Sequence, residues 1–289
     1  MEERYKVTQK AGMYGMIGNI FLLVFKAGVA FTSRSQAMIA DCINSAGDIF
    51  ASLMTAIGNK IASEPKDEDH NFGHGKAEYI FSLLISLSMM AIALKILYDS
   101  VCSIIYRSEI VFSWWLIIVC CITIAVKLAL YIYARKALKK YNNILLESNM
   151  KDHRNDCVVT LFTATSVILS KFGIYWFDGI VGIGISIWIF YTGIKIFIES
   201  YNVLMDKSIS EETKQEIKKF VSKYNNVKGV QNIYTIPIGY KYIAVITIFV
   251  DGNLETFKSH EIADKIQDDI VNNFEEVENV IVHVEPKVK

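Results

Sequence analysis

The chain has 289 residues, with 30 basic and 30 acidic side chains, so its formal net charge is zero. Hydrophobic residues make up 52% and charged residues 21%, against about 45–50% and about 25% in an average soluble domain. The charges are unevenly distributed, because residues 207–289 carry 11 basic and 13 acidic side chains while residues 1–206 contain long apolar runs. This pattern predicts a membrane domain over 1–206 and a soluble domain over 207–289, and it excludes disorder and nucleic-acid binding.

Six apolar windows are long enough for a helix to cross a bilayer, which takes about 20 residues. They cover residues 11–32, 37–59, 78–102, 112–134, 145–170 and 177–200. The connections assigned to the inside carry ten basic residues, and those assigned to the outside carry three, which are Arg34, Arg107 and Lys171. The positive-inside rule therefore predicts a multi-pass protein of the cell membrane with both termini in the cytoplasm.

The soluble domain has a mixed pattern of helical and strand periodicity. Helices are predicted over 211–224 and 260–274, and β-branched or aromatic runs predict strands over 229–237, 242–250 and 279–286. The order αββαβ predicts a small α+β domain in two layers, with one antiparallel sheet covered by two helices.

Polar residues inside two of the predicted spans need a reason, because an ionisable residue there costs about 2.5–3.5 kcal/mol on insertion scales. Asn44 and Asp48 lie four residues apart in the second span, and Asp152 and Asp156 are spaced in the same way in the fifth. Each pair therefore shares one face of its helix. Two such faces can enclose a metal ion in a wetted cavity. The structural alternatives are a carboxylate bonded to a nearby lysine and a polar pair that joins two helices.

A second polar cluster lies in the predicted inner loop between the second and third spans. Asp67, His70 and His74 are spaced three and four residues apart, as metal ligands often are. A solvated, charged loop is the alternative interpretation.

Together these segments resemble the cation diffusion facilitator (CDF) transporters over the whole chain. The resemblance rests on six spans, ADCINSAGD in the second span, FGHGKAE in the inner loop, an Asp pair four residues apart in the fifth span, and the αββαβ tail. It implies a homodimeric exporter that exchanges cytoplasmic divalent metal for external protons, with a tail of ferredoxin- or metallochaperone-like fold.

The resemblance also assigns roles to particular residues. It implies a transport site at Asn44, Asp48, Asp152 and Asp156, and a loop site at Asp67, His70 and His74. It further implies a charge interlock between Lys76 and Asp206 that ties the membrane dimer together near the tail. Asp41 either joins the transport site or belongs to a hydrogen-bond network one turn away.

Two departures from the zinc-type members affect the predicted metal. Asp152 stands where those members usually have a histidine, and the neighbouring His153 points about 100° around the helix, as expected of a structural or outer neighbour of the site. In the tail, Gln231 and Ile246 replace two ligands of the family's two-metal site. A single weaker tail site at His260, His283 and Glu285 stays open beside the alternative of surface histidines.

A transport site built from oxygen alone favours hard ions, whereas imidazole and thiolate favour Zn²⁺, copper and Ni²⁺. We therefore expect Mn²⁺ as the transported substrate, with Zn²⁺ or Fe²⁺ as the alternatives, and no bound cofactor. A membrane-anchored metal sensor or scaffold is the alternative from a different class, and a passive channel is a further one. The chain has no HExxH or GxSxG motif, so an intramembrane hydrolase is not expected.

Overall fold

The computed structural model describes residues 2–33, 36–106, 114–174 and 176–287. Within these ranges the side chains of residues 2, 30–33, 36–44, 46, 170, 176 and 178 lie outside the description. The chain divides into two compact units. One contains the six long helices up to Tyr201, and the other joins the loop Pro65–Lys76 to Asn202–Lys289. The predicted boundary between residues 206 and 207 stays a prediction.

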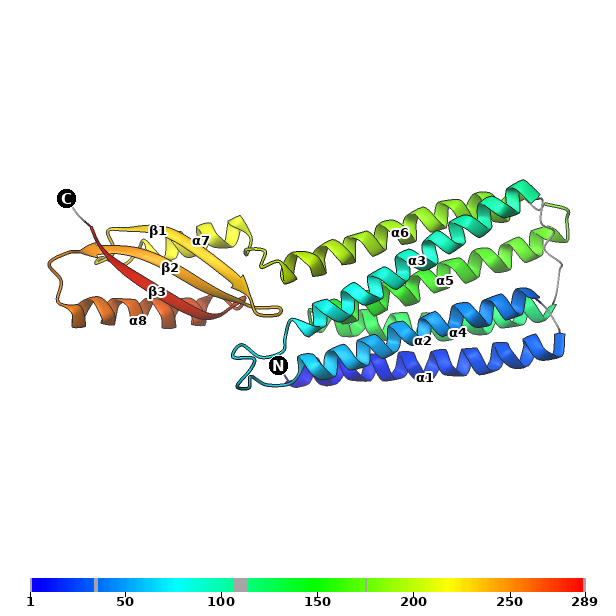
Figure 1. Cartoon of the computed structure of the whole chain (residues 1–289), viewed down its shortest axis with the longest axis horizontal. Coiled ribbons are helices and arrows are strands. Elements are labelled where there is room, and N and C mark those ends of the chain that lie inside the picture. Colours follow the sequence, from blue (N-terminus) through cyan, green and yellow to red (C-terminus); the bar gives the residue numbers. More distant parts are fainter. Residues whose placement is uncertain (1, 34–35, 107–113, 175, 288–289) are drawn as a thin grey trace. The chain divides into compact units, whose positions relative to one another are not determined.

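The first unit is a bundle of six helices (Figure 1). In chain order they are α1 (Glu2–Ser33), α2 (Gln36–Ala62), α3 (Ala77–Tyr106), α4 (Trp114–Lys140), α5 (Ile144–Ser170) and α6 (Trp176–Leu204). Each includes most or all of one predicted span. The prediction of a helical membrane domain is confirmed.

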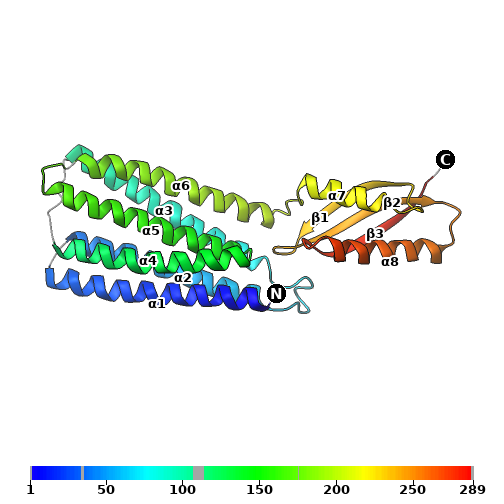
Figure 2. The same ribbon diagram turned by 180° about the vertical axis from the view of Figure 1, so that it is seen from behind.

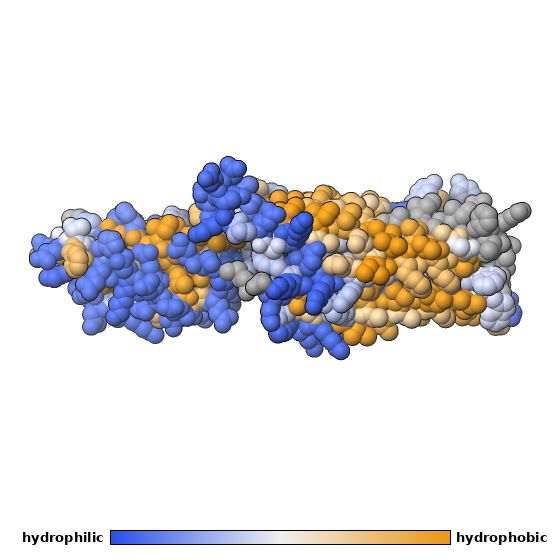
Figure 3. Space-filling view, turned by 90° about the horizontal axis from the view of Figure 1, so that it is seen from below, coloured by the Kyte–Doolittle hydropathy of each residue, from blue (hydrophilic) through white to orange (hydrophobic). Residues whose placement is uncertain are grey.

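Four described segments are long and apolar enough to cross a membrane: Glu3–Val29, Ala77–Tyr106, Trp114–Lys140 and Gly179–Leu204. Helices α2 and α5 have the length but carry the polar residues of the candidate site, so the count of six spans remains a prediction for these two. On the face shown in Figure 3, hydrophobic side chains cover much of the bundle and hydrophilic ones cover most of the smaller unit. Exposed apolar side chains such as Val24 and Ile187 fit contact with lipid.

Helix α1 begins nine residues before the predicted first span, and its first turn contains one half of a tertiary ion pair. The Arg4 guanidinium donates two hydrogen bonds of 2.6 Å to the Glu78 carboxylate on α3, and both residues are buried. Asn143, whose side chain accepts from the amides of Leu145 and Leu146 and so caps α5, also donates to Glu78 at 3.1 Å. This network joins the ends of α1, α3 and α5 on the side of the bundle where α1 begins.

We expect the Arg4→Met substitution to lower the free energy of unfolding by about 3–5 kcal/mol, because it leaves the Glu78 carboxylate buried without its charge partner. The double variant Arg4→Met/Glu78→Met should lose less stability than the single variant, since it buries no unpaired charge. Thermal unfolding of the purified protein in detergent measures both. Equal melting temperatures for the single variant and the parent would contradict this role.

Helix α6 packs closely on α3 because it has glycine at the contact. A Cβ atom placed on Gly182 would lie 3.0 Å from Ser100 Cβ and would clash with its hydroxyl, so a larger residue there would force the Ser100 side chain to move. Small residues allow the close backbone approach on which helix packing in lipid depends.

The second unit has two layers, as predicted. It contains α7 (Glu211–Val221), β1 (Gly229–Pro237), β2 (Tyr242–Asp251), α8 (Thr256–Asn273) and β3 (Val277–Lys287). Alternate residues of β2 form one core with α7 and α8: Ala244, Ile246 and Ile248 contact a cluster that includes Ile217 and Ile266. Both helices therefore cover the same face of the sheet (Figure 2).

The prediction of an antiparallel sheet is wrong in one strand. The order is β1-β2-β3, and β1 pairs with β2 antiparallel, but β3 pairs with β2 in parallel. The cause is α8, whose 18 residues return the chain to the starting end of β2 before β3 begins. A helical crossover of this kind produces a parallel pair.

Candidate metal centre

Helices α2 and α5 place three carboxylates in the interior of the bundle. Asp48 lies on α2, and Asp152 and Asp156 lie one turn apart on α5. Asp48 and Asp152 are 5% and 7% exposed, and the Asp156 side chain is 17% exposed. An ionised carboxylate that is buried in this way needs a charge partner or a metal ion to offset its lost hydration.

Lys127 of α4 supplies a charge partner that sequence reasoning did not assign. Its ammonium donates to Asp48 Oδ2 at 2.7 Å and to Asp156 Oδ2 at 2.5 Å, and its side chain is 1% exposed. The signal was present in the sequence, because Lys127 is an ionisable residue inside the predicted fourth span, as Lys26 is in the first. An ionisable residue inside a membrane span needs a reason, and this holds for the two lysines as it does for the aspartates.

Asp152 and His153 bring further ligand atoms to the same place. One ligand atom each of Asp152, His153 and Asp156 lies within 4.8 Å of the others. Asp152 Oδ2 and His153 Nδ1 are buried and have no hydrogen-bond partner among the described residues. His153 is only 1% exposed. It lies closer to the carboxylates than expected for a residue about 100° around the helix from Asp152.

The backbone around Asp48 is held by amide and hydroxyl groups. Asn19 of α1 donates to the Asp48 carbonyl oxygen at 2.9 Å and to Ser52 Oγ at 3.0 Å. Such bonds fix the rotation of α2 and hence the direction of the Asp48 carboxylate. The side chains of the predicted ligand Asn44 and of Asp41 lie outside the described residues.

A cavity of about 390 Å³ contains the carboxylates and extends away from them in one direction. Asp48, Lys127, Asp152 and Asp156 line it together with Leu116 near the start of α4, Val167 near the end of α5 and Asp99 near the end of α3. It therefore runs towards the end of the bundle opposite the Arg4–Glu78 ion pair.

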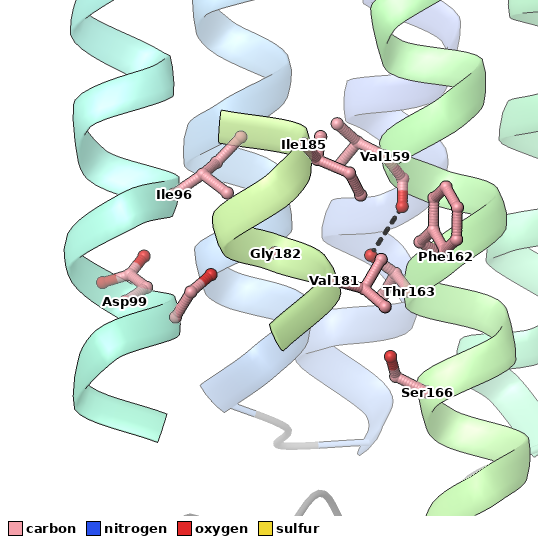
Figure 4. A pocket seen from close by; sticks show the side chains of 10 residues that line it. Ile96, Asp99, Val159, Phe162, Thr163, Ser166, Val181, Gly182 and Ile185 are labelled. Atoms are coloured by element: carbon pink, nitrogen blue, oxygen red, sulfur yellow. Dashed lines mark hydrogen bonds between the residues drawn. The ribbon is translucent and has the colours of Figure 1, made fainter. Parts of the chain in front are cut away.

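A second cavity of about 200 Å³ adjoins the first between α3, α5 and α6 (Figure 4). Ile96, Asp99, Val159 and Thr163 line both cavities. Figure 4 shows the hydroxyls of Thr163 and Ser166 on α5 across from Asp99 on α3. The route away from the three carboxylates is thus mainly apolar, with oxygen atoms of Asp99, Thr163 and Ser166 along it.

The predicted loop ligands come together in the second unit. His70 Nδ1 lies 3.1 Å from Asp67 Oδ1, and His74 Nε2 lies 3.5 Å from Asp67 Oδ2. The pKa of the Asp67 carboxyl lies below its ordinary value, chiefly because the His70 backbone amide donates to it at 2.6 Å. His74 Nδ1 is 3.2 Å from the Pro65 carbonyl oxygen, and a proton on Nδ1 would leave Nε2 free to bind a metal.

Of the remaining predicted residues, the two of the charge interlock contact each other, whereas the three predicted tail ligands do not come together. Lys76 Nζ donates to Asp206 Oδ1 at 2.7 Å within the second unit. In the tail, His283 pairs with Glu285 at 3.3 Å, whereas His260 pairs with Asp264 at 3.0 Å. Among the described residues, His260, His283 and Glu285 do not form a cluster of three ligand atoms. The interlock and the tail site stay predictions.

Long apolar helices around a buried set of carboxylates define a membrane protein that handles cations. The chain belongs to the cation efflux, or cation diffusion facilitator, family of transporters, and it is therefore not an enzyme. The model of the cation efflux transmembrane domain matches residues 13–205, and that of the cation efflux protein's cytoplasmic domain matches residues 209–287. The resemblance inferred from the sequence motifs is confirmed.

Several relatives match nearly the full length of the chain. The manganese efflux system protein MneP of Bacillus subtilis is 28% identical, over 98% of this chain and 98% of the relative. The magnetosome protein MamM of Paramagnetospirillum magneticum is 27% identical over 97% and 89%. The cation-efflux pump FieF of Shewanella oneidensis is 27% identical over 92% and 89%.

Proposed function

We propose that this transporter exports Mn²⁺ from the cytoplasm in exchange for protons. The observation that carries the proposal is the convergence of Asp48, Asp152 and Asp156 in one buried cavity. With the Asn44 side chain, for which the sequence argument stands, the centre offers four oxygen ligands. The full-length similarity to a protein named as a manganese efflux system supports the same metal.

The oxygen chemistry favours Mn²⁺ over softer ions. Carboxylate and amide oxygens suit Mn²⁺, and Mg²⁺ is disfavoured because it usually keeps several of its waters. The nitrogen of His153 favours Zn²⁺ or Fe²⁺, because imidazole is a good ligand for both. Export of Zn²⁺ or Fe²⁺ is therefore the second candidate.

Exchange follows from the same three carboxylates. Aspartates that give up a divalent ion can accept protons in its place, so one site serves both ions at different moments. The cavity extends towards the bundle end that the positive-inside rule places outside. In this orientation the Arg4–Glu78 network lies at the cytoplasmic end, where its opening would admit metal.

The surrounding assembly belongs to the proposal as well. Both termini lie in the cytoplasm of a cell membrane, and two chains form a homodimer through the membrane domain and the tail. The Lys76–Asp206 ion pair ties the membrane dimer together near the tail. Cytoplasmic metal at Asp67, His70 and His74 supplies the transport site or signals metal load.

Uptake of Mn²⁺ and Zn²⁺ into proteoliposomes, with and without an imposed proton gradient, tests the proposal. We expect Mn²⁺ uptake to exceed Zn²⁺ uptake and to rise when protons can move in the opposite direction. Mn²⁺ flux that ignores the gradient would indicate a channel and contradict exchange. The absence of flux for every metal, in protein that binds Mn²⁺, would favour the sensor or scaffold.

A further inference from the structure

We propose that Lys127 is a tethered cation that competes with the transported metal for Asp48 and Asp156. The inference rests on the proposed function, because it concerns how the same carboxylates bind and release their ion. A competitor built into the chain would weaken metal binding and help the ion to leave.

The first argument is the position of the ammonium group. Lys127 Nζ bonds Asp48 Oδ2 on α2 and Asp156 Oδ2 on α5, at 2.7 Å and 2.5 Å. It thereby joins the two helices whose carboxylates would bind a metal. A divalent ion that bridges these oxygens needs the same lone pairs, and its charge repels an ammonium at that distance. The two cations therefore exclude each other.

The second argument is that the lysine leaves one carboxylate available. Asp152 Oδ2 is buried and has no hydrogen-bond partner among the described residues, and it faces the same cavity. An arriving ion can first bind Asp152 while Lys127 still holds Asp48 and Asp156. When the ion displaces the Lys127 ammonium, Asp48 and Asp156 complete its coordination. When the ammonium returns to these two carboxylates, the ion loses them as ligands.

The third argument is that the Lys127 ammonium has an alternative hydrogen-bond partner within reach. Thr123 lies one turn before Lys127 on α4, is 3% exposed, and its hydroxyl has no partner in the described part of the chain. Helical side chains lean towards the preceding turn, so the flexible stem of Lys127 reaches Thr123 by rotation about its own bonds. Thr123 also lines the 390 Å³ cavity, which provides the space.

A purely structural ion pair would behave differently. If Lys127 only neutralised the carboxylates and held the helices together, its removal would destabilise the bundle without tightening metal binding. A tethered competitor makes the opposite prediction for affinity. The two roles are therefore separated by the sign of the change in the dissociation constant.

Mn²⁺ binding to the purified full-length protein tests the inference, with the isotherm of the Asp156→Asn variant subtracted to isolate the transport site from the loop. We expect Lys127→Met to lower the apparent dissociation constant at this site at least tenfold and to slow turnover at saturating Mn²⁺. Lys127→Arg keeps the charge and bonds carboxylates more firmly. The affinity of this variant for Mn²⁺ should therefore equal that of the parent or be lower. Lys127→Gln replaces Lys127→Met if the latter does not fold.

Lys26→Met is the matched control. Lys26 is a second buried lysine of the same cavity and donates to Ser45 Oγ at 3.0 Å, and its removal leaves the ion pairs of Lys127 in place. We expect its effect on affinity to be smaller than threefold.

The outcomes are distinct. An Asp156→Asn isotherm equal to that of the parent overturns the proposed transport site itself. If that variant loses the site but Lys127→Met binds Mn²⁺ no more tightly than the parent, the transport site stands and the tethered competitor is wrong. An equal gain of Mn²⁺ affinity in Lys26→Met also overturns the competitor, because the loss of any positive charge from the cavity would then tighten binding.

Discussion

Asp48→Asn is expected to reduce Mn²⁺ uptake by more than about 100-fold, since loss of an outer-shell partner alone typically costs 10–100-fold in metal affinity or activity. The substitution keeps the shape of the side chain and removes its charge at the point where α2 faces α5. It also deprives Lys127 of one of its two carboxylate partners. Uptake of Mn²⁺ into proteoliposomes measures the effect.

The control for this substitution is Asp268→Asn, which makes the same chemical change at an exposed position of α8. It should leave uptake at the parental level. An Asp48→Asn protein that folds, inserts and still transports Mn²⁺ like the parent would show that the ion does not pass this residue.

Asp152→His is expected to shift metal preference from Mn²⁺ towards Zn²⁺, raising the ratio of Zn²⁺ to Mn²⁺ uptake by more than about tenfold, because imidazole suits Zn²⁺ and carboxylate suits Mn²⁺. Asp152 is the carboxylate that Lys127 does not hold, so the new nitrogen can reach an ion without first displacing the ammonium. Competitive uptake of the two metals by one preparation measures the ratio directly.

His153→Gln serves as the companion variant, because it removes the nitrogen that already lies beside the centre. If His153 is only a neighbour, the ratio of the parent is preserved. Should the unsubstituted protein take up Zn²⁺ as well as Mn²⁺, and His153→Gln abolish the Zn²⁺ part, the oxygen-only description of the site would be wrong while the family assignment would stand.

The carboxylate part of the site could be predicted because it depends on spacing within single helices. Residues four apart share a face in any helix, so Asp152 and Asp156 had to lie together, and polarity required that face to be buried. The six long helices follow from the length of the apolar runs for the same reason. These properties are local, and a sequence displays them directly.

The features that were missed depend on partners far away in the chain. Lys127 lies in the strongly apolar α4, where averaged hydropathy conceals a single charge, and its partners are on α2 and α5. Arg4 in the first turn of α1 pairs with Glu78, which lies on α3. The direction of β3 depends on where α8 returns the chain. None of these pairings is set by neighbouring residues.

The loop Pro65–Lys76 belongs to the same compact unit as the tail, and this has a mechanical consequence. A Cβ on Gly75 would lie 2.8 Å from the Ile238 carbonyl oxygen, so the loop packs directly against the turn between β1 and β2. The tail unit is consequently linked to the bundle by three covalent tethers, at α2, α3 and α6, instead of one. A force on the tail therefore pulls on α2, the helix that carries Asp48, as well as on the helix from which the tail emerges.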